Sequence, residues 1–164
     1  MKIFIKRTLF AILGLMLLAA AMVAIEYFGG QSMGLFSGSR PANLGYTNGR
    51  FSPPSWKPNC VSSTVEKSDS HYIEPLAFTG TPDANWKKLR GIIRGTPRVN
   101  VLQDSAVYLY AEFKSAGLGF IDDVEFALDE KTGAIHVRSA SRLGVRDFNV
   151  NRNRIEAIRA QLAK

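Results

Sequence analysis

The sequence predicts an α+β fold: a five-stranded antiparallel sheet with two helices on one face, preceded by an N-terminal transmembrane helix. Three observations lead to this fold class. An apolar stretch follows a basic start, several strand-like runs follow one another directly, and two amphipathic segments flank them. The expected order is β-α-β-β-β-β-α, because consecutive strands favour antiparallel pairing and two one-sided helices cover a single sheet face.

Residues 1–28 have the composition of a membrane anchor or a signal. Residues 8–25 are 18 uncharged positions, just enough to cross a hydrocarbon core of about 30 Å at about 1.5 Å per residue. A cleaved secretory signal has the same basic start and apolar middle, and Ala19 and Ala21 fit the small residues near its end. Because the apolar run is long for a signal, we expect a retained anchor in which residues 8–25 span the membrane.

The charges around this stretch predict its orientation. Three cations precede it, and only Arg40 follows closely. The positive-inside rule then keeps the N-terminus in the cytoplasm. We therefore expect a membrane-anchored domain on the non-cytoplasmic side, most simply at the bacterial inner membrane facing the periplasm. Cys60 is the only cysteine, so no disulfide can form within the chain.

The charge of the domain argues against a nucleic-acid partner. The chain has a formal charge of +7, but residues 26–164 hold 18 Lys and Arg against 14 Asp and Glu, which leaves +4. Surfaces that bind nucleic acid are strongly and locally basic. This small, evenly mixed excess therefore predicts no nucleic-acid binding.

The rest of the chain divides into a linker and a domain. Residues 29–58 are rich in Gly, Ser, Pro and Asn without an apolar period, which predicts a mobile or loosely draped linker and extended approach segment. Residues 59–164 are more regular and form the predicted globular α+β domain. Its first strand is predicted over residues 72–78, where Pro75 cannot donate to a ladder and so belongs at an edge or a bulge.

A helix is predicted over residues 82–94. Thr81 suits the N-cap, and Pro82 suits the first helical position. Gly95 and Pro97 end the helix. Apolar side chains recur on one stripe at helical spacing: Trp86, Leu89, Ile92 and Ile93.

Two hairpins follow this helix. The first joins strands predicted over residues 98–103 and 106–114. The second joins strands predicted over residues 121–128 and 134–141, across the turn-forming sequence of residues 129–133.

Several motifs resemble those of a known family, in the family's order. They extend over roughly residues 40–160 and comprise Arg40–Gly45, Pro58–Ser63, His71–Leu76, Phe120–Phe126, Val137–Gly144 and Asn151–Glu156. Together they are similar to domain-of-unknown-function family 1499. The resemblance implies a small envelope or organelle protein, often with a leader, in a family without an assigned reaction.

Side-chain parity along the second hairpin predicts a polar sheet face. Because successive strand residues point to opposite faces, an even-length turn places Asp123 and Glu125 on one face with basic residues of the partner strand. Val124 and Phe126 then face the helices. The preceding strand adds tyrosines to the polar face, which the two helices leave uncovered. The candidate ligand-binding residues on it are Tyr108, Tyr110, Asp123, Glu125, His136, Arg138 and Arg142.

Three roles are open for this polar face. Adjacent strands carry opposite charges, so the face can be a solvated structural ladder in which a pair such as Glu125 with Arg138 contributes about 0.2–1 kcal/mol. Alternatively, Arg138 and Arg142 bind an anionic or polar partner, since Arg offers bidentate geometry. The third role is catalysis, with Asp123 or Glu125 as base and His136 as acid.

Cys60 and His71 permit a second catalytic interpretation, a thiol nucleophile with its base. No local motif of such enzymes surrounds them, and a packed small residue is the commoner role of a cysteine. Two histidines and one cysteine, widely spaced, form no zinc pattern, and there is no phosphate-cradling Gly loop. We therefore expect no metal and no cofactor.

Asp122 is the exception on its strand, because parity turns it toward the apolar face. A buried carboxylate needs partners. Ser139, Ser141 or an arginine of the last helix can supply them. Asn149 or Asn151 caps that helix, and Arg152 and Arg154 lie close to its start. These residues predict a structural knot more readily than a site.

The function that these patterns favour is a non-enzymatic, membrane-anchored binding or assembly module of the envelope that uses the polar sheet face. Its ligand is an anionic or polar molecule or an envelope protein. The alternative is a hydrolase-type enzyme based on carboxylate and His chemistry, or on Cys60 and His71. A closed pocket on the polar face would favour the enzyme, and an open plane would favour binding.

Overall fold

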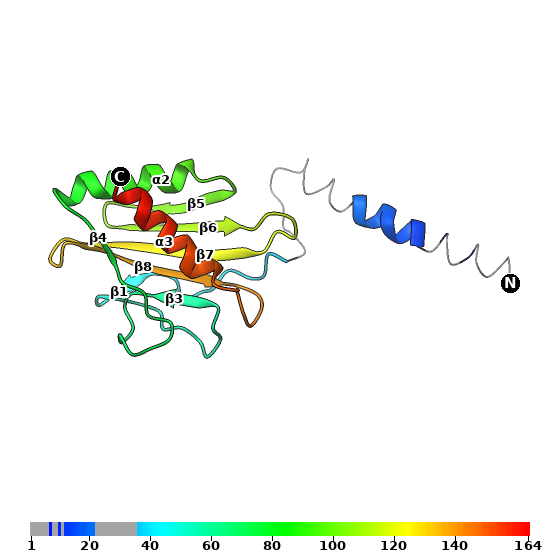
Figure 1. Ribbon diagram of the computed structural model, residues 1–164, viewed down its shortest axis with the longest axis horizontal. Coiled ribbons are helices and arrows are strands. Elements are labelled where there is room, and N and C mark those ends of the chain that lie inside the picture. Colours follow the sequence, from blue (N-terminus) through cyan, green and yellow to red (C-terminus); the bar gives the residue numbers. More distant parts are fainter. Residues whose placement is uncertain (1–6, 8–9, 11, 22–35) are drawn as a thin grey trace. The chain divides into compact units, whose positions relative to one another are not determined.

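The computed structural model describes residues 7, 10, 12–21 and 36–164 (Figure 1). The chain divides into two units, Met1–Gly34 and Leu35–Lys164. In the first unit, residues 12–21 are helical. No helix among the described residues is both long and apolar enough to cross a membrane. Positions 8, 9, 11 and 22–25 of the expected span lie outside the described residues, and the anchor stays a prediction.

The second unit is built on an antiparallel sheet of six strands. In it β3, β8, β7, β6 and β5 follow one another, and β4 continues the edge that β3 forms along β8. The strands are β3 (Cys60–Ser62), β4 (Leu76–Ala77), β5 (Val99–Asp104), β6 (Tyr108–Lys114), β7 (Ile121–Asp129) and β8 (Ala134–Ser141). The predicted α+β class is confirmed, but the predicted number of five strands is wrong because β3 was missed.

The edge of the sheet differs most from prediction. The strand predicted over residues 72–78 is reduced to the two residues of β4, directly after Pro75, which has no N–H for a ladder. At its start, only an isolated bridge joins Tyr72 to Ser62 of β3. A separate two-stranded sheet, β1 (Tyr46–Thr47) with β2 (Arg50–Phe51), was not predicted.

Two helices belong to this unit, α2 (Pro82–Gly95) and α3 (Val150–Leu162). As predicted, the Thr81 side chain caps α2 by accepting from the N–H of Ala84. Asn149 takes the N-cap position of α3 in a left-handed conformation, but its side chain makes no capping bond. Asp147 caps instead, because its Oδ2 accepts from the N–H of Asn151 at 2.9 Å.

Both helices pack on the same face of the sheet (Figure 1). The core includes Trp86 and Leu89 of α2, Ile155 and Ile158 of α3, and the alternate apolar residues of β6, β7 and β8 beneath them. This confirms the predicted apolar face. On the sheet side, the core contains Leu109, Ala111, Phe113, Val124, Phe126, Leu128, Ile135 and Val137.

Candidate functional site

The polar cluster lies on the sheet face opposite the helices. Between β7 and β8 the turn has four residues, and the register pairs Glu125 with Arg138 and Asp123 with Ala140. In the other direction, β6 pairs Tyr110 with Glu125 and Glu112 with Asp123. The predicted parity is therefore confirmed. The polar cluster consists of Tyr108, Tyr110, Glu112, Asp123, Glu125, Arg138 and Arg142.

Glu125 is at the centre of the cluster and is 0% exposed. Its Oε1 accepts hydrogen bonds from the Tyr108 hydroxyl at 2.7 Å and from the backbone N–H of Gly45 at 2.7 Å. Its Oε2 accepts from Nη1 of Arg138 at 3.0 Å. Both oxygens of this buried carboxylate are thus occupied, as a buried charge requires.

Asp123 is held by a second arginine and is 1% exposed. Arg142 binds it in a bidentate manner, with Nε to Oδ2 at 2.9 Å and Nη2 to Oδ1 at 2.7 Å. The Tyr110 hydroxyl donates to Oδ1 at 2.6 Å. Arg142 also hydrogen-bonds Glu112, so one guanidinium joins two carboxylates.

Glu112 connects the cluster to the chain that precedes the sheet. The guanidinium of Arg40 donates to its Oε1 from Nε at 3.0 Å and from Nη2 at 2.8 Å. Burial alone raises the pKa of Glu112, but hydrogen bonds from Arg142 and Arg40 outweigh it, so the pKa lies below its ordinary value. With Arg40 included, three carboxylates face three guanidinium groups and the charges balance.

The two tyrosines act as fixed donors. Burial raises the pKa of Tyr108, and the neighbouring Glu125 carboxylate raises it further. Burial and the hydrogen bond to Asp123 do the same for the pKa of Tyr110. Both hydroxyls stay protonated at neutral pH and donate to the carboxylates.

A covering segment, residues 36–51, lies over this polar face. Besides the bonds from Arg40 and the Gly45 N–H, it supplies Phe51, which is buried, and Tyr46, whose ring stacks on His136 with centroids 5.8 Å apart. The expectation of an uncovered polar face is therefore wrong, whereas the expected mobility of residues 29–58 stays a prediction. Polar contacts made by single backbone groups leave no pattern in a sequence.

His136 shares the polar face but not the cluster. Its Nδ1 lies 3.1 Å from the Ser63 hydroxyl, and its Nε2 lies 3.8 Å from Oδ2 of Asp129. Burial lowers the pKa of His136, and Asp129 opposes this effect in part. The structure does not join His136 to Asp123 or Glu125, whose oxygens are bonded to other groups, so the predicted acid–base arrangement is not assembled.

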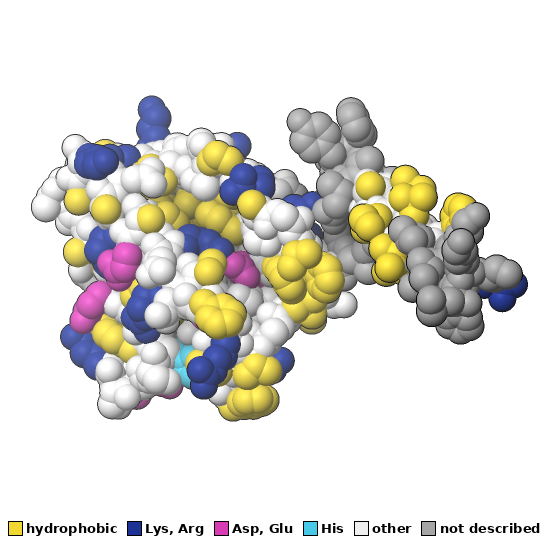
Figure 2. All heavy atoms as spheres, turned by 45° about the vertical axis from the view of Figure 1, so that its right-hand side comes forward, with side chains coloured by type: hydrophobic (Ala, Val, Ile, Leu, Met, Phe, Trp, Pro, Cys, Tyr) yellow, Lys and Arg dark blue, Asp and Glu magenta, His cyan; other side chains and the backbone are white. Residues whose placement is uncertain are grey.

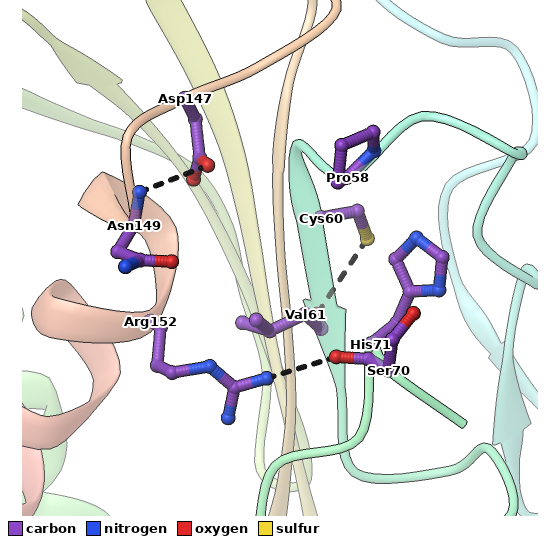
Figure 3. A pocket seen from close by; sticks show the side chains of 8 residues that line it. All are labelled: Pro58, Cys60, Val61, Ser70, His71, Asp147, Asn149 and Arg152. Atoms are coloured by element: carbon purple, nitrogen blue, oxygen red, sulfur yellow. Dashed lines mark hydrogen bonds between the residues drawn. The ribbon is translucent and has the colours of Figure 1, made fainter.

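Cys60 and His71 do line one pocket, of about 110 Å³ (Figure 3). Both ring nitrogens of His71 have oxygen partners. Nδ1 lies 2.7 Å from the Asp69 carboxylate, and Nε2 lies 3.0 Å from the Lys57 carbonyl oxygen. The Sγ of Cys60 contacts the Val61 carbonyl at 3.6 Å. Burial raises the pKa of the Cys60 thiol to about 11, so it stays protonated at neutral pH and is a poor nucleophile.

Asp122 is paired with one of its predicted partners, an arginine of the last helix. Its Oδ2 accepts from Nη2 of Arg154 at 2.5 Å, and the same guanidinium lies 4.9 Å from the centroid of the Phe113 ring. Nη1 of Arg154 also donates to Ser139, which in turn bonds Asn151 of α3. Arg152 differs from the prediction, because it binds the backbone carbonyls of residues 70 and 72. These bonds join α3 to the sheet.

In the part of the chain that the structure describes, no three His, Cys, Asp or Glu side chains gather to hold a metal ion. The fold and the polar cluster define the class of protein: a small α+β domain whose sheet buries an apolar core on one face and a charge-balanced cluster on the other. The family model "Protein of unknown function (DUF1499)" matches residues 50–162. The chain belongs to this family, as its motifs indicated. No curated protein and no solved structure matches it.

Proposed function

We propose that the protein is a non-enzymatic, membrane-tethered module of the cell envelope, and that its polar cluster fastens the chain leading to the membrane. The observation that carries the proposal is the closed state of the cluster. The covering segment contributes Arg40 and the Gly45 N–H to it, and both bonds end on carboxylates of the sheet. The domain is thereby held to the segment that follows the apolar N-terminal stretch.

The same closure argues against the enzyme alternative. A general base must come within hydrogen-bond reach of a substrate proton. Every carboxylate oxygen of Asp123 and Glu125 already accepts a hydrogen bond, and both side chains are buried. The Cys60 thiol is protonated at neutral pH. These groups suit a structural role better than hydrolysis.

The tether itself rests on the sequence. Residues 8–25 are uncharged and apolar, and three cations precede them, which favours a retained span with the domain outside the cytoplasm. In this proposal the bacterial inner membrane holds the N-terminus and the domain works in the periplasm, where it binds or assembles with envelope components.

Two measurements on the full chain test this proposal. A reporter that is active only outside the cytoplasm, fused after Lys164, should be active. An alkaline wash should leave the protein in the membrane pellet. Release of the protein by alkali, or activity of a cytoplasmic reporter alone, would contradict the proposal. As a control, the same fusion with residues 8–25 deleted should give a soluble, cytoplasmic protein.

A second candidate function is recognition of an anionic ligand by Arg138 and Arg142. It is favoured by one detail: Nε of Arg138 is buried and has no hydrogen-bond partner among the described residues. The ligand would reach it only after the covering segment leaves the sheet. Citrate or phosphate should then raise the melting temperature more in Arg40→Ala than in the wild type, and equal shifts would remove this candidate.

A further inference from the structure

One end of the sheet carries a group of exposed apolar side chains, here called the apolar rim. They come from the loop between β6 and β7, from the loop between β8 and α3, and from the first residue of α3. The N–H of Arg142 donates to the Ile121 carbonyl at 3.2 Å, which places the two loops side by side. Figure 2 shows hydrophobic side chains gathered on the surface of this unit. The apolar rim consists of Leu118, Leu143, Val145, Phe148 and Val150.

The rim is held in place rather than left loose. Phe148 is 90% exposed and has a φ of 53°, a strained conformation for a bulky residue. Asp147 maintains this turn, because its carboxylate accepts from the N–H of Asn149 at 3.2 Å and from the N–H of Asn151 at 2.9 Å. The strained backbone at Phe148 therefore holds its phenyl ring on the exposed surface. Backbone strain of this kind is found mostly at functional positions.

The exposed charge within the rim loop between β8 and α3 is positive. Arg146 is exposed between Val145 and Phe148. The acidic residue of the same loop, Asp147, is turned inward to cap α3. Apolar side chains combined with an outward cation suit the interface of a bilayer, where rings enter the acyl boundary and cations meet phosphate groups.

The covering segment connects the rim to the predicted anchor. Phe36 packs on Phe120 beside the rim with ring centroids 5.1 Å apart, and Gly38 lies against Leu143. Only residues 26–35 separate Phe36 from the end of the expected span. Ten residues extend at most about 35 Å. If residues 8–25 cross a membrane, the rim cannot move far from its surface.

We propose that the apolar rim docks on the lipid surface of the membrane in which the chain is anchored, with Phe148 and Val145 entering the interface and Arg146 meeting lipid phosphates. This inference rests on the proposed tether. It adds a second membrane contact, one that fixes the orientation of the domain above the bilayer.

The test uses the full chain reconstituted in vesicles that contain an anionic phospholipid. A nitroxide label is attached in the variants Val145→Cys and Val107→Cys. These positions form a matched pair, because both valines are 49% exposed but Val107 precedes β6 and lies at the opposite end of that strand from the rim. The buried Cys60 resists labelling, and the chain without an added cysteine measures that background.

A water-soluble nickel chelate should reach the label at position 145 at least roughly threefold less than the label at position 107. Oxygen, which dissolves in the bilayer, should still reach the label at position 145. Equal exposure of both labels to the chelate would overturn docking. Shielding at position 145 that appears also in detergent and grows with protein concentration would overturn it too, since a second copy would then cover the rim. Alkaline release of the chain would instead contradict the tether itself.

Discussion

Arg142 is the side chain on which most of the polar cluster depends. It bonds Asp123 through two nitrogens and also bonds Glu112 and Tyr110. Burial alone lowers the pKa of Arg142, but its hydrogen bonds with Asp123 and Glu112 outweigh this effect and raise it, which keeps the guanidinium charged. Because both carboxylates are shielded from water, they cannot replace this partner with solvent.

Replacing Arg142 with Met should therefore lower the free energy of unfolding by about 3–5 kcal/mol, the usual cost of breaking a buried ion pair on one side. Urea titration followed by circular dichroism measures this loss. Arg146→Met is the matched control, since Arg146 is exposed in the same loop, and it should change stability by no more than about 0.5 kcal/mol. Similar small losses in both variants would mean that the cluster is a solvated ladder, one of the three roles that the sequence left open.

His136 should make stability depend on pH. Its pKa in the folded state is lowered by burial, so the unfolded chain binds a proton more readily. The stabilisation is then fully present above the ordinary pKa of about 6.5 and is lost as the pH falls through the lower folded value. Between pH 7.5 and 5 the wild type should lose stability, and His136→Gln should lose less over the same range. Parallel curves for the two proteins would contradict this assignment.

At the scale of elements, the start of α3 shows how a loop replaces a standard cap. Asn149 stands at the N-cap in a left-handed conformation with a φ of 66° and makes no capping bond with its side chain. Asp147 accepts from two backbone N–H groups and from the Asn151 side chain. The helix therefore depends on Asp147 for its cap and on Asn149 only for its backbone conformation.

Two substitutions separate these contributions. Asp147→Ala should destabilise the protein by about 1–2 kcal/mol, because it removes the cap and leaves the backbone N–H of Asn151 without its partner. Asn149→Gly should be neutral or slightly stabilising, since glycine adopts positive φ without strain. Both values come from thermal unfolding. A larger loss for Asn149→Gly than for Asp147→Ala would show that the cap is assigned to the wrong residue.

Elements that depend on local pattern could be predicted from the sequence, and contacts between distant segments could not. Thr81 and Pro82 mark the start of α2, and the four-residue turn after Asp129 sets which residues of β7 and β8 share a face. By contrast, β3 has only three residues, which are too few to show the alternation of apolar and polar side chains that indicates a strand. The contact of Gly45 with Glu125 joins residues 80 positions apart through a backbone N–H, which every residue except proline has.

For the site, most members of the polar cluster were predicted, but Glu112 and Arg40 were not among the candidates and His136 lies outside the cluster. Tyr108, Tyr110, Asp123, Glu125, Arg138 and Arg142 do lie together on one face. Parity says which face a side chain takes but not what covers that face. Their role as ligand-binding residues stays a prediction, and it now requires the covering segment to move.

In the whole molecule, the polar cluster joins the covering segment to the sheet. This role requires that the covering segment, residues 36–51, stays bound to the sheet in solution. The bond from the Gly45 N–H to Glu125 reports on this directly, because an amide exchanges its hydrogen with solvent only when such a bond opens.

Hydrogen exchange of the Gly45 amide in the full chain, measured by NMR at neutral pH, is the most direct test. The Gly45 amide should exchange at least roughly 10³-fold more slowly than in an unstructured peptide, approaching the rate of the core amides of β7. Exchange within about tenfold of the unstructured rate, while the β7 amides remain protected, would show that the covering segment is open and that the polar cluster does not hold it.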